Sequence, residues 1–157
     1  MKARDPQLAL QFEVAPKSAA GWHNGAALAY LGRQITLQLD TDRKQAVLDG
    51  AVLHLPLTPD ASARQVQDAA EAWQRREAAR VLKEVTVRLT NAIGRSMPAL
   101  ALSFAARSGW IQVDVDTLRC NWHLIEQPMD SIEQVLDRAI AALPRSTRGD
   151  DLFAACA

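Results

Sequence analysis

The sequence predicts an α+β fold, and three observations carry that prediction. Apolar and polar residues alternate between residues 26 and 57 and again between 99 and 116, which is the period of half-buried strands. Residues 62–93 contain neither Pro nor Gly, as one long helix requires. A second amphipathic helix follows over residues 130–143. Strands and helices are therefore expected in separate runs, which favours α+β over a regular α/β alternation.

The first strands are expected to form an antiparallel meander from about Ala26 to Leu57. The alternating segments are ALAYLG, QITLQLD and QAVLDGAVLHLPL. Asp49-Gly50 is a dipeptide that type I′ hairpin turns favour, because both central residues of that turn need φ > 0. Residues 1–21 mix polar residues with Ala and Pro and are expected to be a poorly ordered arm, leaving 22–157 as a single domain.

The long helix has recognisable ends. Ser62 followed by Gln65 can form a capping box, and Asp60 is a competing N-cap. Gly94 is expected as the C′ residue. The apolar stripe of its first half is displaced around the axis from that of its second half, at about 100° per residue. We therefore expect either a bend between Arg76 and Arg80 or different packing partners for the two halves.

The rest of the chain is expected to add a hairpin and a short helix. ALALSF and WIQVDVD are predicted to pair across AARSG, and NWHLIEQP is predicted to be an extended link. Asp130 is then the expected N-cap of the last helix. One continuous apolar face predicts that this helix packs on a core, and its residues are Ile132, Val135, Leu136, Ala139, Ile140 and Leu143.

Composition excludes several classes of protein. Eighteen basic and eighteen acidic residues cancel, which argues against a broad nucleic-acid surface. Cys120 and Cys156 are too few and too far apart for a disulfide framework or a metal knuckle, so Cys120 is interpreted as a small buried thiol. No apolar run is long enough for a signal peptide or a membrane span. The expected location is the cytoplasm.

Three segments in register carry a resemblance, and they are residues 22–39, 71–94 and 120–143. Together they resemble the YgjP-like zinc metallopeptidases, a family similar to SprT and other zincins. WHNGAALAYLGRQITLQL resembles the family's "dG..lpYLGr.yrL.v", and EAWQRREAARVLKEVTVRLTNAIG resembles its "WyrreAr..l.erv...a..lg". CNWHLIEQPMDSIEQVLDRAIAAL resembles "lNWrLi.aP...idyVv.HElaHL". The resemblance implies a zincin-like α+β domain, in which the last helix is the former active-site helix, with zinc as the family's cofactor. Trp73 and Trp122 match family tryptophans and are expected to be core anchors.

The same resemblance implies that the zinc site is lost. Two histidines one helical turn apart hold the metal in such a site, and a glutamate beside the first accepts a proton from metal-bound water. Counting from Asn121-Trp122 without gaps places the first ligand at Arg138, the general base at Ala139 and the second ligand at Ala142. A third family histidine falls near Arg148. No catalytic residue, bound metal or other cofactor is therefore expected.

Two further groups of residues are candidates for other sites. Asp114 and Asp116 alternate in a predicted strand, so both carboxylates would share one face and could form a relocated site with His123. A solvated strand face and ordinary histidines, His23 and His54 among them, are the simpler interpretation. Arg76, Arg80 and Lys83 share a helix face that could contact phosphates or an acidic partner, but Glu77 and Glu84 flank it.

Three functional hypotheses follow from these residues. The leading one is a non-catalytic pseudo-metallopeptidase that binds or regulates an unidentified protein or peptide partner, with the peptide lying along a sheet edge. The second is a metal-dependent hydrolase or peptidase that uses relocated residues. The third is a nucleic-acid or self-association module that uses the Arg76/Arg80 face. The sequence predicts no particular oligomeric state.

Overall fold

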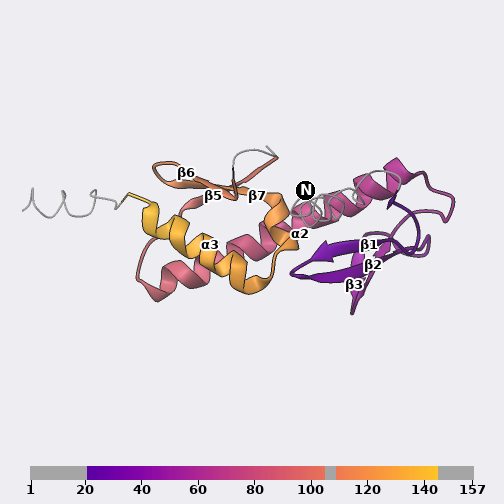
Figure 1. Ribbon diagram of the computed structural model, residues 1–157, viewed down its shortest axis with the longest axis horizontal. Coiled ribbons are helices and arrows are strands. Elements are labelled where there is room, and N and C mark those ends of the chain that lie inside the picture. The colour runs from indigo at the N-terminus through magenta and orange to yellow at the C-terminus, as the bar shows by residue number, and fades with distance from the viewer. Residues whose placement is uncertain (1–20, 105–108, 145–157) are drawn as a thin grey trace, which may run out of the picture. The chain divides into compact units, whose positions relative to one another are not determined.

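The computed structural model describes residues 21–104 and 109–144 (Figure 1). These residues form helices and strands in the order β1-β2-β3-β4-α2-β5-β6-β7-η3-α3, which confirms the α+β class. Residues 1–20 of the predicted arm lie outside the described residues, and so does the tail after Pro144, which includes Arg148 and Cys156. Within residues 21–104 and 109–144 no helix is long and apolar enough to cross a membrane.

The described residues divide into two compact units. Residues 21–77 and 126–128 form the first, and residues 78–104, 109–125 and 129–144 form the second. Each unit has its own sheet, and helix α2 (Ala63–Ala92) contributes its first half to one and its second half to the other. The single domain expected over residues 22–157 stays a prediction.

The sheet of the first unit is mixed, so the predicted meander is wrong. Its order is β1-β2-β4-β3, with antiparallel β1–β2 and β3–β4 pairs joined by a parallel β2–β4 pair. Burial explains the order, because Leu53 and Leu55 of β4 are fully buried whereas β3 is only half-buried. The more apolar strand takes the central place. The strands are β1 (Ala27–Tyr30), β2 (Arg33–Leu39), β3 (Val47–Asp49) and β4 (Val52–Leu55).

The two hairpin turns of this sheet differ from the predicted one. Between β1 and β2, Leu31 (φ 49°) and Gly32 (φ 79°) both have positive φ, as a type I′ turn requires. Between β3 and β4 the pairing of Asp49 with Val52 makes Gly50 and the following alanine the central residues, and only Gly50 has positive φ (61°). The turn is where the sequence predicts it, but it is not type I′.

Both predicted ends of α2 are confirmed. The Ser62 N–H donates to Gln65 Oε1 at 2.8 Å, and the Gln65 N–H donates to Ser62 Oγ at 3.2 Å. At the other end the Arg95 N–H donates to the Thr90 carbonyl at 2.9 Å and the Gly94 N–H to the Asn91 carbonyl at 3.2 Å, with Gly94 at φ 66°. This pattern is a complete Schellman motif.

The displaced stripes of α2 pack in different units. In the first unit Trp73 is 5% exposed and its ring centroid lies 5.0 Å from that of Tyr30. Gln74 Nε2 donates to the Ala29 carbonyl at 3.1 Å, which fixes the helix to β1. In the second unit Val81, Leu82 and Val85 are buried. The two halves of α2 therefore pack on different partners, which confirms the second of the two predicted alternatives.

The sheet of the second unit contains a strand that the sequence did not predict. Its order is β5-β7-β6, in which β5 (Ala99–Ser103) is parallel to β7 (Thr117–Asn121) and β6 (Ile111–Val113) is antiparallel to it. The predicted hairpin across AARSG is therefore wrong, because β7 lies between its two strands. Leu118 and Cys120 of β7 are almost fully buried, which accounts for its central position.

The last two elements lead to the C-terminal helix. The predicted extended link is instead a 3₁₀-helix, η3 (Trp122–Glu126), in which Trp122 is 5% exposed. Helix α3 (Met129–Ala142) begins just before Asp130, which therefore lies in the first turn and not at the N-cap. The predicted apolar face is confirmed. Its fully or nearly fully buried members are Ile132, Leu136, Ala139, Ile140 and Leu143.

Candidate functional site

Helix α3 has a complete packing face and an exposed edge. Arg138 and Ala142 are both exposed, one turn apart on that edge. Ala139 is only 7% exposed and packs in the core. The positions expected for two zinc ligands therefore reach solvent, whereas the position expected for the general base does not.

Arg95, from the loop after α2, holds the C-terminal end of α3. Its Nη1 donates to the Ile140 carbonyl at 2.7 Å, and its Nη2 donates to the carbonyls of Leu143 at 2.6 Å and Pro144 at 2.7 Å. The Ile140 carbonyl lies in the last turn of α3, where carbonyls lack the ordinary intrahelical donors, and the other two carbonyls follow directly after the helix. The cation also lies at the negative end of the helix dipole. Sequence reasoning missed this contact, because 45 residues separate Arg95 from Ile140.

The donor set on α3 does not fit zinc. Alanine has no ligating atom, and the guanidinium of Arg138 is permanently protonated, with no lone pair to offer a cation. Within residues 21–104 and 109–144 no group of three or more His, Cys, Asp or Glu side chains could hold a metal ion. No catalytic step through a metal can therefore be derived from these residues.

The candidate relocated site is not brought together. Asp114 and Asp116 flank the turn between β6 and β7, so the prediction that both lie in a strand with their side chains on one face is wrong. Asp114 Oδ2 accepts a hydrogen bond from Arg119 Nε at 3.1 Å. His123 lies beyond the other end of β7, a strand about 16 Å long at 3.3 Å per residue. Its ring stacks on Trp122 with centroids 3.8 Å apart.

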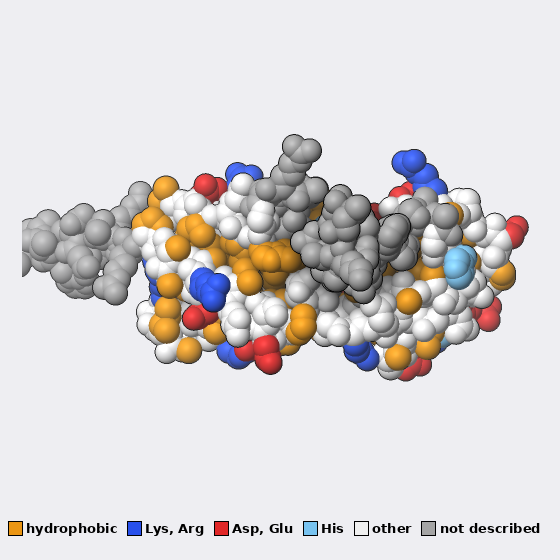
Figure 2. All heavy atoms as spheres, viewed as in Figure 1, with side chains coloured by type: hydrophobic (Ala, Val, Ile, Leu, Met, Phe, Trp, Pro, Cys, Tyr) orange, Lys and Arg blue, Asp and Glu red, His pale blue; other side chains and the backbone are white. Residues whose placement is uncertain are grey.

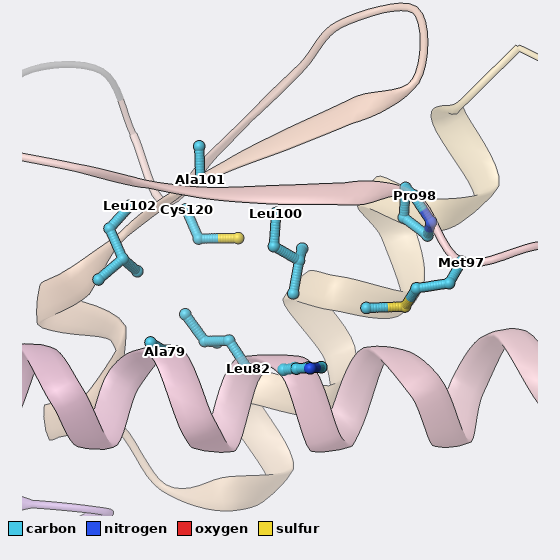
Figure 3. Close-up of a pocket in the computed structure, with 9 residues that line it drawn as sticks. Ala79, Leu82, Met97, Pro98, Leu100, Ala101, Leu102 and Cys120 are labelled. Atoms are coloured by element: carbon cyan, nitrogen blue, oxygen red, sulfur yellow. The ribbon is translucent and has the colours of Figure 1, made fainter.

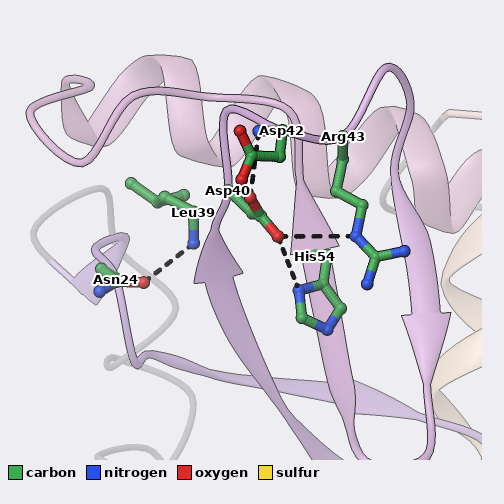
Figure 4. A network of polar contacts seen from close by, with 6 residues as sticks. All are labelled: Asn24, Leu39, Asp40, Asp42, Arg43 and His54. Atoms are coloured by element: carbon green, nitrogen blue, oxygen red, sulfur yellow. Dashed lines mark hydrogen bonds and ion pairs between the residues drawn. The ribbon is translucent and has the colours of Figure 1, made fainter.

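The other two histidines have structural surroundings in the first unit. His54 projects from β4 on the side opposite Leu53 and Leu55, as expected, and its Nδ1 lies 3.6 Å from Asp40 Oδ2 (Figure 4). The same carboxylate lies 3.5 Å from Arg43 Nε, so Asp40 links the end of β2 to the following loop. His23 is exposed, with Nδ1 2.8 Å from the Asn24 carbonyl oxygen.

The three basic residues predicted to share a face of α2 are exposed, as expected, but belong to different units. Arg76 is in the first unit, and Arg80 and Lys83 are in the second. Arg80 Nη1 donates to both carboxylate oxygens of Glu84, at 3.1 and 3.2 Å. Acidic and basic side chains are interspersed on the face seen in Figure 2. None of these observations favours the nucleic-acid hypothesis over a solvated helix face.

The β6 edge is a possible binding surface that sequence reasoning did not identify. In the order β5-β7-β6, β6 pairs with β7 along one side and with no described strand along the other. The Trp110 carbonyl and the Asp114 N–H form hydrogen bonds with the two end residues of β7. The backbone groups of the alternating Ile111 and Val113 therefore point away from β7. Trp110 and Val113 are 41% and 36% exposed, so this edge is also apolar.

Comparison with known proteins identifies one family. Residues 6–136 match the family described as YgjP-like, metallopeptidase domain. The match ends two residues before Arg138, the first of the three α3 positions. No curated protein and no solved structure matches the chain.

Proposed function

This chain belongs to the YgjP-like family of metallopeptidase domains, and from that premise we propose that it binds extended peptides without cleaving them. One observation carries the proposal: α3 keeps a fully packed apolar face while its exposed edge, at Arg138 and Ala142, presents no metal ligand. A packed fold without metal ligands is the pattern expected of a binding module. Catalysis by zinc needs donor atoms that this edge does not provide.

The peptide would add to the β6 edge as a further strand. Main-chain hydrogen bonds to Ile111 and Val113 would supply affinity in this mode, and alternate side chains of the peptide would supply specificity. The exposed side chains of Trp110 and Val113 favour apolar residues in the bound segment. The unpaired N–H and C=O groups of such an edge are a ready template for pairing with another chain, and the bound peptide would occupy them.

The proposal is tested by measuring fluorescence anisotropy of labelled peptides derived from an unfolded protein. Val113→Pro removes an N–H that faces the open side while leaving the β6–β7 ladder intact, and proline is tolerated at such an edge position. We expect Val113→Pro to weaken binding about tenfold or more, since one lost main-chain bond and a clash cost about 1.4 kcal/mol or more. The matched variant Val113→Ala keeps the N–H and should weaken binding less than threefold.

Two results would contradict the proposal. One is equal peptide affinity for Val113→Pro and the unmodified chain, with circular dichroism showing both folded. The other is the appearance of peptide fragments when the unmodified chain is incubated with its peptides and added zinc. The first result removes the β6 site, and the second removes the non-catalytic role.

A further inference from the structure

A second candidate binding site lies within the second unit, between α2 and β5. It is an apolar pocket with a volume of about 380 Å³, within the range usual for small-molecule sites. In Figure 3, Leu82 points from α2 into the pocket, and Leu100 and Leu102 point into it from β5 on the opposite side. Ala101 projects from the other face of β5.

The burial of the lining residues distinguishes a floor from a mouth. Leu82 and Cys120 are each 1% exposed and form the floor. Ala79, Lys83 and Met97 also line the pocket but are exposed, so they lie at its opening to solvent. Burial raises the pKa of the Cys120 thiol to about 12, which keeps this part of the floor uncharged at neutral pH. The pocket therefore offers an apolar interior that a ligand can reach from water.

Lys83 gives the mouth a positive charge, and it forms no ion pair with any residue in the described ranges 21–104 and 109–144. It is the only charged residue among those that line the pocket, and none of the lining residues is acidic. The adjacent acid on α2, Glu84, is held by Arg80 at 3.1 Å. An ammonium group at the rim of an apolar cavity suits a ligand with an anionic head and a hydrocarbon body.

We propose that this pocket binds a medium-chain carboxylate, with its alkyl chain between α2 and β5 and its carboxylate at Lys83. The site is separate from the β6 edge, since β5 and β6 lie on opposite sides of β7. It therefore does not depend on peptide binding. Each methylene that enters the pocket should raise the affinity about fourfold, until the cavity is full.

The proposal is tested by titrating the full chain with hexanoate, octanoate and decanoate below their micelle concentrations. Calorimetry should show the fourfold rise per methylene. In a sample with ¹³C-labelled methionine methyl groups, the Met97 signal should shift on binding while that of Met129, outside the pocket lining, stays in place. Lys83→Gln should weaken octanoate binding about two- to fivefold and leave 1-octanol binding unchanged, as the loss of one exposed ion pair predicts.

Two further variants make the test decisive. Arg64→Gln removes an exposed cation of α2 outside the pocket and should leave octanoate affinity unchanged. Ala79→Trp fills the mouth from an exposed helix position and should abolish binding of both ligands. The proposal is overturned if affinity does not depend on chain length, if Lys83→Gln and Arg64→Gln behave alike, or if Ala79→Trp still binds octanoate.

Discussion

Replacing the half-buried Arg95 by alanine should destabilise the chain more than replacing any exposed charged residue of the second unit. The guanidinium donates three hydrogen bonds to the carbonyls of Ile140, Leu143 and Pro144, and its side chain is half-buried. A hydrogen bond of this kind contributes about 1 kcal/mol net, because the freed carbonyls can turn to water. The favourable interaction with the helix dipole adds about 0.5 kcal/mol.

The expected loss in the free energy of unfolding is therefore about 3–4 kcal/mol. Arg95→Lys keeps the charge but not the planar fork that reaches three acceptors, so it should lose about half as much. Arg88→Ala is the matched control, because Arg88 of α2 also contacts α3, but only through a single exposed ion pair with Glu133. That pair should contribute no more than about 1 kcal/mol.

Urea denaturation followed by circular dichroism gives the three free energies. If Arg95→Ala were no less stable than Arg88→Ala, with equal dependence on urea, the three carbonyl contacts would not stabilise α3. The reasoning about how this helix is held would then be wrong.

The remaining predictions concern two turns, a thiol and a buried helix position. Gly50→Ala should lower the free energy of unfolding by about 1–2 kcal/mol, since only the positive φ of this residue (61°) opposes a side chain. Gly32→Ala should lower it by about 1–3 kcal/mol more, because a Cβ there would also lie 2.9 Å from Pro128 Cγ. Thermal unfolding compares the two variants. Because the pKa of Cys120 is raised to about 12, the folded chain keeps its proton while the unfolded chain loses it from about pH 9, so stability should fall between pH 9 and 12. Cys120→Ala should lack that part of the alkaline loss, and an equal loss in both chains would refute the assignment. Ala139→Glu should destabilise the chain by about 2–4 kcal/mol, because it places a carboxylate in the core. Ala142→Glu should destabilise it by less than about 0.5 kcal/mol, because Ala142 is exposed. Equal urea midpoints for the two variants would contradict the burial of Ala139.

Local features of the fold were predictable from sequence, but the partners of its strands were not. Ser62, Gln65 and Gly94 mark the ends of α2 because capping depends on residues within one turn of the helix end. Alternation located the strands of the first sheet but says nothing of which strand lies beside which. The parallel β2–β4 pair was therefore missed.

The second unit was harder to predict because its central strand lacks a clear apolar pattern. TLRCN carries a charged residue, Arg119, in its middle, so it lacks the apolar run that marks a buried strand, although Leu118 and Cys120 are buried on one face. Missing β7 led to the wrong placement of Asp114 and Asp116 in a strand. The Lys83 pocket was missed for a related reason, since it forms only when β5 lies against α2.

Zinc affinity tests the central claim most directly, because that claim concerns the donor atoms on α3. The measurement is a titration of the purified full chain with zinc against a chromophoric chelator of micromolar affinity. We expect the unmodified chain to leave the chelator saturated, and we expect the variant Arg138→His with Ala142→His, which places two imidazoles one turn apart on an exposed edge, to compete for the metal. One equivalent of zinc taken up by the unmodified chain, and retained when His123, Asp114 and Asp116 are replaced, would contradict the account.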